Sequence, residues 1–229
     1  MIAALQAAVA DVAGDQPRGL LVRAEGRVVS GGVDVHLFDG LDPDAAARLW
    51  RELLAMIHTV EELPFPVIFA AHALTLTWGF ELALACDLIV AAEGAQFGLV
   101  EIVVGLTPSM GGPQRLAEKA GANRAKELVM TGALYDAETL ERWNVVNRVL
   151  DDDGFDDAAR AFARQLADGP TRAHAATKAI VRGQLEGGVR EADARVPQLA
   201  GDLFATDDLK GAVRSFLEQG PGHATYEGR

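Results

Sequence analysis

The sequence predicts an α/β protein that ends in a helical region. Short apolar stretches typical of buried strands alternate with segments of helical periodicity over roughly the first two thirds of the chain. Such alternation favours a parallel sheet with right-handed crossovers. From about Asp156 onward the pattern is helical only, with a break at Gly169-Pro170 and an end at 220–222. With 229 residues, of which 49% are hydrophobic, the chain is long enough to bury a core.

The first predicted elements are a helix and a short strand. Apolar residues at helical spacing predict a helix over 2–13, and the short apolar run 20–22 that follows Gly14 and Pro17 predicts a strand. Asp42 is suited to cap a helix that has Pro43 at its first position and ends before Pro64. The later predicted elements are a strand over 67–71, a helix over 79–86, a strand over 88–92, a helix opened by Pro113 and a helix from Ala125 to Gly132.

Charge and composition exclude several classes of function. The net charge is −12, so attraction to nucleic acid or to anionic lipid is not expected. Cys86 is the only cysteine, which rules out an internal disulfide, and no Cys/His cluster has the spacing of metal ligands, so we expect no metal. The sequence shows no secretion signal and no apolar run long enough to span a membrane, so we expect a soluble, cytoplasmic protein.

Two glutamates interrupt apolar runs and are the first candidates for chemistry. Glu81 lies within 80–86, and Glu101 lies within 97–104. A carboxylate buried in such a run is costly unless it is paired, hydrogen-bonded or protonated, and these conditions are typical of acid/base catalysis. The alternative is that Glu81 lies on a solvated helix edge and Glu101 in a surface turn.

Residues 70–116 read AAHALTLTWGFELALACDLIVAAEGAQFGLVEIVVGLTPSMGGPQRL, which resembles the signature of the enoyl-coenzyme A hydratase/isomerase (crotonase) family. Three further pieces follow the order of that family: VVSGGVDV at 28–35, ELVMTGALYDAETLERWNVVNRVL at 127–150 and ATDDLKGAVRSFLEQ at 205–219. The resemblance implies a crotonase-like spiral of ββα turns and an all-helical C-terminal region that builds homotrimers, often paired into hexamers. We expect the spiral over 1–168 and the helical oligomerisation region over 169–229.

The resemblance also implies a ligand and a site. Family members bind acyl-CoA thioesters and stabilise an enolate-like oxyanion with two backbone N–H groups. These match Gly31 and Trp78, and Gly32, Val33 and Asp34 complete the substrate loop. Read without the family, the Gly31-Gly32 pair is a turn. Asp34 is expected to brace the loop rather than to react.

In hydratases of this family two glutamates hold one water molecule, and the matching positions are Glu81 and Glu101. Two carboxyl groups in one small apolar site cannot both ionise comfortably, so one acts as acid and the other as base. We expect Glu81 to activate water for attack on the β-carbon, and Glu101 to exchange the proton at the α-carbon. Coenzyme A is part of the substrate, so no separate cofactor is expected.

Two features depart from the family pattern. Trp78 stands where the family usually has Gly or Ala; its ring could turn away, narrow the acyl pocket or block the thioester, or simply belong to the core. Before the helix over 2–13, the usual strand, Arg-Pro turn and Asn-Ala-Leu segment are missing, as a misassigned start codon or a lost function would produce.

The sequence thus predicts an enoyl-CoA hydratase that acts on 2-trans-enoyl-CoA, as in fatty acid metabolism. One alternative is an enoyl-CoA isomerase, which can use a single carboxylate at Glu101. The other is a catalytically impaired acyl-CoA-binding protein, suggested by Trp78 and the short N-terminus.

Overall fold

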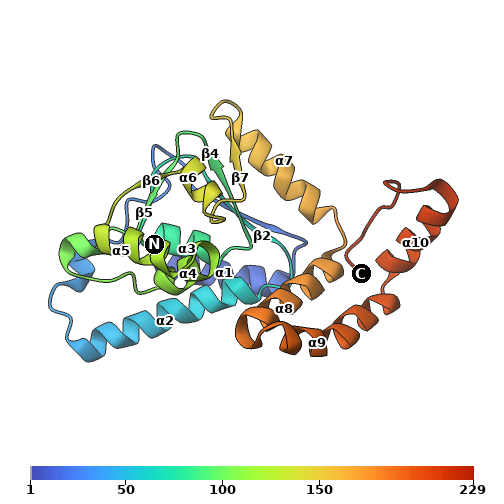
Figure 1. Cartoon of the computed structure of the whole chain (residues 1–229), viewed down its shortest axis with the longest axis horizontal. Helices are drawn as coiled ribbons and strands as arrows, with labels where there is room; N and C mark the ends of the chain where they lie inside the picture. The colour runs from blue at the N-terminus through green and yellow to red at the C-terminus, as the bar shows by residue number, and fades with distance from the viewer. Residues whose placement is uncertain (1) are drawn as a thin grey trace. The chain divides into compact units, whose positions relative to one another are not determined.

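The chain forms two compact units in a computed structural model that describes residues 2–229 (Figure 1). Met1, which falls in the predicted spiral segment, lies outside the described residues. Of the described residues, the first unit comprises 2–13, 21–62 and 67–160, and the second comprises 14–20, 63–66 and 161–229. The second unit thus gathers three stretches that are distant in sequence.

A four-stranded sheet with the order β1-β2-β4-β7 organises the first unit. Its strands are β1 (Leu20–Arg23), β2 (Val67–Ala71), β4 (Leu88–Ala92) and β7 (Arg148–Leu150). The β2–β4 and β4–β7 pairs are parallel, which confirms the predicted parallel pairing. All five residues of β2 are buried, as expected for a strand that is covered on both faces.

Five predicted helices are present and begin close to their predicted positions: α1 (Ile2–Asp15), α2 (Pro43–Glu62), α3 (Trp78–Ala85), α4 (Gly112–Ala120) and α5 (Ala122–Thr131). A sixth, α6 (Ala137–Arg142), was not predicted. The Asp42 carboxylate accepts a hydrogen bond from the Ala45 N–H at 2.7 Å, and Pro43 occupies the first helical position, as predicted for α2. Helix α5 begins three residues earlier than predicted, directly after Gly121.

A second sheet of three strands was not predicted from the sequence. It consists of β3 (Thr75–Leu76), β5 (Gln96–Gly98) and β6 (Tyr135–Asp136), in the order β3-β5-β6. The β3–β5 pair is parallel and the β5–β6 pair is antiparallel. Short 3₁₀ helices η1 (Val35–Phe38) and η2 (Glu101–Val104) complete this unit.

Helix α3 lies at the centre of the first unit. Its residues from Gly79 to Ala85 are all buried, and it packs against α2, α4 and β4. The Phe80 ring contacts the Phe97 ring of β5, with 5.1 Å between the ring centroids. Because α3 is buried on all sides, any polar side chain on it must find partners inside the protein.

The second unit contains the helical C-terminal region that was predicted. Helix α7 (Phe155–Ala167) continues into it from the first unit, followed by α8 (Thr171–Gly187), α9 (Val189–Asp202), η3 (Leu203–Ala205) and α10 (Asp207–Gln219). Helix α8 packs along α9 (Figure 1). The buried Asp208 carboxylate accepts hydrogen bonds from the Glu227 and Gly228 N–H groups, which ties the last residues to the start of α10. None of the helices in the described residues is both apolar enough and long enough for a membrane span.

Candidate functional site

Glu81 is buried in α3 and held by two main-chain donors. Its side chain is 2% exposed, and one carboxylate oxygen, Oε1, accepts hydrogen bonds from the N–H groups of Met110 and Gly112, both at 2.9 Å. A Cβ atom at Gly112 would lie 3.0 Å from Cγ and Oε1 of Glu81. Glycine at 112 therefore lets the backbone approach the carboxylate closely, and the solvated helix edge considered for Glu81 is wrong.

Opposing effects act on the protonation of Glu81. Burial raises the pKa of its carboxyl group above the ordinary value, while the Gly112 and Met110 N–H groups and the charge of Arg115 act in the opposite direction. Arg115 on α4 is itself buried and forms a bidentate ion pair with Glu61 of α2, at 2.6 and 2.5 Å. The ion pair fixes the guanidinium of Arg115, whose positive charge acts on Glu81.

Glu101 is the first residue of η2 and is less buried than Glu81. Its Oε2 atom is buried and accepts no hydrogen bond from the described residues. Burial and, to a smaller extent, the charge of Glu81 raise the pKa of Glu101 to about 7, so the two carboxyl groups lie within electrostatic range of each other. The two glutamates that the sequence singled out therefore influence each other electrostatically.

The apolar residues that follow Glu101 are not part of the core. Val103 is 76% exposed, and Ile102 and Val104 are also exposed. They form the 3₁₀ turn η2, which closes at Gly105 in the left-handed region with φ 73°. The apolar run around Glu101 is therefore partly a surface feature, in contrast to the buried run around Glu81.

The loop over residues 30–34 lies along the start of α3. The Leu76 N–H donates to the Ser30 carbonyl at 3.0 Å, and the Ser30 hydroxyl donates to the Leu76 carbonyl at 3.1 Å. A Cβ atom at Gly79 would come within 2.4 Å of the Ser30 Cβ, so only glycine permits this approach. Within the described residues, the main-chain N–H groups of Gly31 and Trp78 donate no hydrogen bond.

Thr77, directly before α3, has an unusual backbone. Its dihedral angles are φ 50° and ψ −123°, a region typical of glycine in a tight turn and rare for β-branched residues. Its buried hydroxyl has no hydrogen-bond partner among the described residues. The conformation sends the chain sharply from β3 into α3, and it is maintained by the Thr77 N–H, which donates to the Gly98 carbonyl at 2.9 Å.

A mainly apolar cavity of about 400 Å³ lies beside this loop. Its lining residues are Ala3, Leu5, Val33, Asp34, Leu37, Leu53, Met56, Trp78 and Met110. Three of the predicted substrate residues, Val33, Asp34 and Trp78, therefore meet at one cavity. Neither glutamate lines the cavity, but Met110 does, and its N–H binds Glu81. Asp34 caps η1 by accepting a hydrogen bond from the His36 N–H at 3.0 Å, and its expected bracing of the Gly31 loop stays a prediction.

Met110, Gly112 and Arg115 belong to this site and were missed by the sequence analysis. Two of them act through main-chain N–H groups, which any residue except proline carries. The one available signal was the Gly111-Gly112 pair directly before a helix, since glycines there permit close approach to a charged group.

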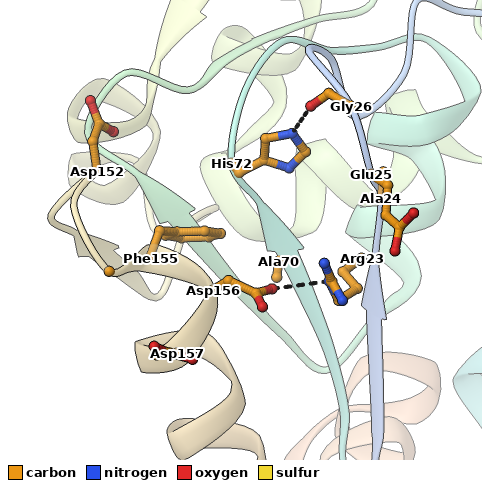
Figure 2. Close-up of a pocket in the computed structure, with 11 residues that line it drawn as sticks. Arg23, Ala24, Glu25, Gly26, Ala70, His72, Asp152, Phe155, Asp156 and Asp157 are labelled. Atoms are coloured by element: carbon orange, nitrogen blue, oxygen red, sulfur yellow. Dashed lines mark hydrogen bonds and ion pairs between the residues drawn. The ribbon is translucent and has the colours of Figure 1, made fainter.

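A second cavity, of about 600 Å³, lies where β1, β2 and β7 end (Figure 2). Open α/β sheets often bind ligands at this edge, but the predicted site residues are elsewhere. Its charged groups are largely paired with each other or with the backbone. Arg23 contacts Asp156 at 3.0 Å, and Nε2 of His72 is 2.9 Å from the Gly26 carbonyl. Among the described residues, no group of three or more His, Cys, Asp or Glu is arranged to hold a metal ion.

Comparisons with known proteins agree with this architecture. A sequence model described as enoyl-CoA hydratase/isomerase matches residues 1–228. A protein of Rhizobium meliloti (strain 1021) named "Probable enoyl-CoA hydratase" is 33% identical over 214 residues, which cover 93% of this chain and 82% of the relative. "Probable enoyl-CoA hydratase EchA17" of Mycobacterium bovis is 39% identical over 146 residues, which cover 64% of this chain but only 55% of the relative.

Solved structures of enoyl-CoA hydratases match the fold. That from Mycobacterium smegmatis superposes with a TM-score of 0.89 and 28% identity, over 96% of this chain and 86% of that one. The structure from Polaromonas sp. JS666 superposes with a TM-score of 0.90 and 26% identity, over 98% of this chain and 88% of that one. The protein therefore has the crotonase fold, as predicted. The chain belongs to the enoyl-CoA hydratase/isomerase family.

Proposed function

We propose that the protein is an enoyl-CoA hydratase that adds water across the double bond of 2-trans-enoyl-CoA thioesters. The observation that carries this proposal is the carboxyl pair: Glu81, buried and held by two N–H groups, within electrostatic range of Glu101, whose pKa is raised to about 7. A pair of this kind can hold one proton between two groups and so provide an acid and a base together.

The reaction uses both carboxyl groups. Ionised Glu81 accepts a proton from water as the water oxygen bonds to the β-carbon, and protonated Glu101 gives its proton to the α-carbon. After each turnover the pair still carries one proton, which is now on Glu81. Return of that proton to Glu101 restores the starting state. Coenzyme A is part of the substrate, and no separate cofactor enters these steps.

The negative charge that develops on the thioester oxygen needs its own donors. The N–H groups of Gly31 and Trp78 donate no hydrogen bond within the described residues, and their segments lie side by side. Preorganised donors of this kind typically stabilise an oxyanion by ~3–4 kcal/mol each. The start of α3 at Trp78 adds a favourable helix dipole.

Isomerisation of a 3-enoyl thioester is the second candidate. Glu101 alone, with a raised pKa and a buried Oε2 that accepts no hydrogen bond from the described residues, has the properties of a single proton shuttle. Glu81 would then only orient the substrate. The two functions therefore differ in whether Glu81 must exchange a proton.

The test compares Glu81→Gln, Glu101→Gln and the wild type on crotonyl-CoA and on a 3-enoyl-CoA. For a hydratase, each substitution should lower kcat for hydration by ~10²–10⁴, because it removes one proton-transfer group. Glu127→Gln is the matched control, since Glu127 is exposed and pairs with Arg124 on α5. Full hydration activity in either site variant would reject the paired mechanism. Turnover of the 3-enoyl thioester alone would favour the isomerase.

A further inference from the structure

Trp78 contributes to two parts of the candidate site at once. Its main chain begins α3, three residues before Glu81, and its ring lines the apolar cavity. The indole N–H donates a hydrogen bond to the Gly32 carbonyl at 3.2 Å. The ring is therefore neither turned away from the site nor part of the closed core. It is fixed to the loop that carries Gly31 and forms part of the cavity wall.

The wall that Trp78 forms is mainly apolar. Leu53 and Met56 come from α2, and Val33 and Leu37 come from the loop and η1. The charged member of the lining is Asp34, whose carboxylate would repel an acyl group that carries its own carboxylate. A volume of about 400 Å³ lies within the range of small-molecule sites. These properties suit an uncharged hydrocarbon tail.

We propose that Trp78 determines acyl-chain specificity and positions the oxyanion loop. The indole ring limits the length of the hydrocarbon tail that enters the cavity, and its N–H bond to Gly32 holds the Gly31 N–H in place. This inference rests on the proposed function, because it takes the cavity as the place of the acyl group. The two roles use different parts of one side chain, so different substitutions separate them.

Trp78→Ala removes the ring and enlarges the cavity. The ratio of kcat/KM for long-chain to short-chain 2-enoyl-CoA should then rise by at least roughly tenfold, the effect of about one methylene in an apolar pocket. Trp78→Phe keeps an aromatic wall but removes the N–H donor. It should preserve the chain-length preference and lower kcat for every chain length by roughly tenfold. Trp143→Phe is the control, because its ring packs on Tyr135 away from the cavity and should change neither quantity.

Binding of saturated acyl-CoA, measured by calorimetry, separates this inference from the proposed function. If no enoyl-CoA is turned over but Trp78→Ala shifts the binding preference to longer chains, the hydratase proposal and the positioning role fail, and the specificity role of Trp78 stands. If chain-length preference is the same in the wild type and Trp78→Ala, the specificity role is overturned. A Trp78→Phe kcat equal to that of the wild type overturns the positioning role. Trp78→Leu replaces Trp78→Ala should the latter not fold.

Discussion

Glu81 and Glu101 carry the same chemical group in different surroundings. Glu81 is fully buried but receives two main-chain hydrogen bonds and the field of Arg115, whereas Glu101 is more exposed and its Oε2 receives none from the described residues. Such asymmetry is what separates an acid from a base within one pair. The titration belongs to the pair as a unit, because each charge affects the other.

The pair predicts a specific pH dependence of activity. In the proposed mechanism, hydration needs one proton on the pair, and so does dehydration, since the transfer only moves that proton from one carboxyl group to the other. Because burial raises the pKa of Glu101 to about 7, this proton is retained in weak acid and lost as the pH rises through neutral. We expect kcat/KM in both directions to fall above about pH 7 with the same midpoint.

Absorbance of the enoyl thioester, followed from both the enoyl and the hydroxyacyl substrate across neutral pH, measures this midpoint. A rate that stays constant through neutral pH, or midpoints that differ between the two directions, would contradict a shared proton.

At the scale of elements, the start of α3 is the point where several segments meet. The turn from β3 into α3 at Thr77 sets where Trp78 and Glu81 lie, and the glycines at 79 and 112 let the loop and the α4 start approach α3. Residues held in sparsely populated backbone regions cluster at functional sites, where the surrounding structure keeps them in place.

Thr77→Gly is expected to stabilise the protein. Glycine adopts φ 50° without steric cost, and the substitution also removes a buried hydroxyl with no partner among the described residues. After the entropy that glycine adds to the unfolded chain, we expect a gain of ~1 kcal/mol in the free energy of unfolding. Urea denaturation measures it.

Thr77→Ala is the control for this experiment, because it removes the hydroxyl but keeps a Cβ atom. If Thr77→Gly is no more stable than Thr77→Ala, the backbone at this position is not strained. If it is less stable than the wild type, the interpretation of the turn is wrong.

For the whole molecule, the long elements are those that the sequence predicts well. Helix α2 and strands β2 and β4 are long enough to show a period or a continuous apolar run. Strands β3, β5 and β6 have two or three residues each and show neither, so the small sheet escapes prediction. The boundary near residue 168 stays a prediction.

The candidate site was also predictable from the sequence only in part. Glu81 is conspicuous in sequence because a charge contradicts the apolar pattern of its helix, and the family resemblance points to Gly31, Trp78 and Glu101. The Met110 and Gly112 donors leave no side-chain signal, so only the folded chain reveals them. The hydrogen bond from Trp78 to Gly32 also depends on a ring orientation that residue identity does not specify.

The expected homotrimer or hexamer is a prediction for the whole molecule. Helix α10 exposes Phe216 (60%) and Leu217 (79%), and burying such side chains typically stabilises association by ~1.5–3 kcal/mol each. We expect light scattering to give a trimer or a dimer of trimers, and Phe216→Asp with Leu217→Asp to give a smaller species. Glu218→Gln on the same helix should leave the mass unchanged. A trimer that survives both apolar substitutions would exclude this face as the contact.

The indole of Trp78 borders the cavity, whereas Trp50 packs against Phe38 and Trp143 against Tyr135. Indole fluorescence responds to the polarity of its surroundings, so replacing Trp50 and Trp143 by phenylalanine leaves a single emitter at the cavity wall. If an acyl tail fills the cavity as proposed, its entry expels solvent, and we expect that emission to shift to shorter wavelength. The remaining tryptophan would then report occupancy optically, with neither a label nor turnover.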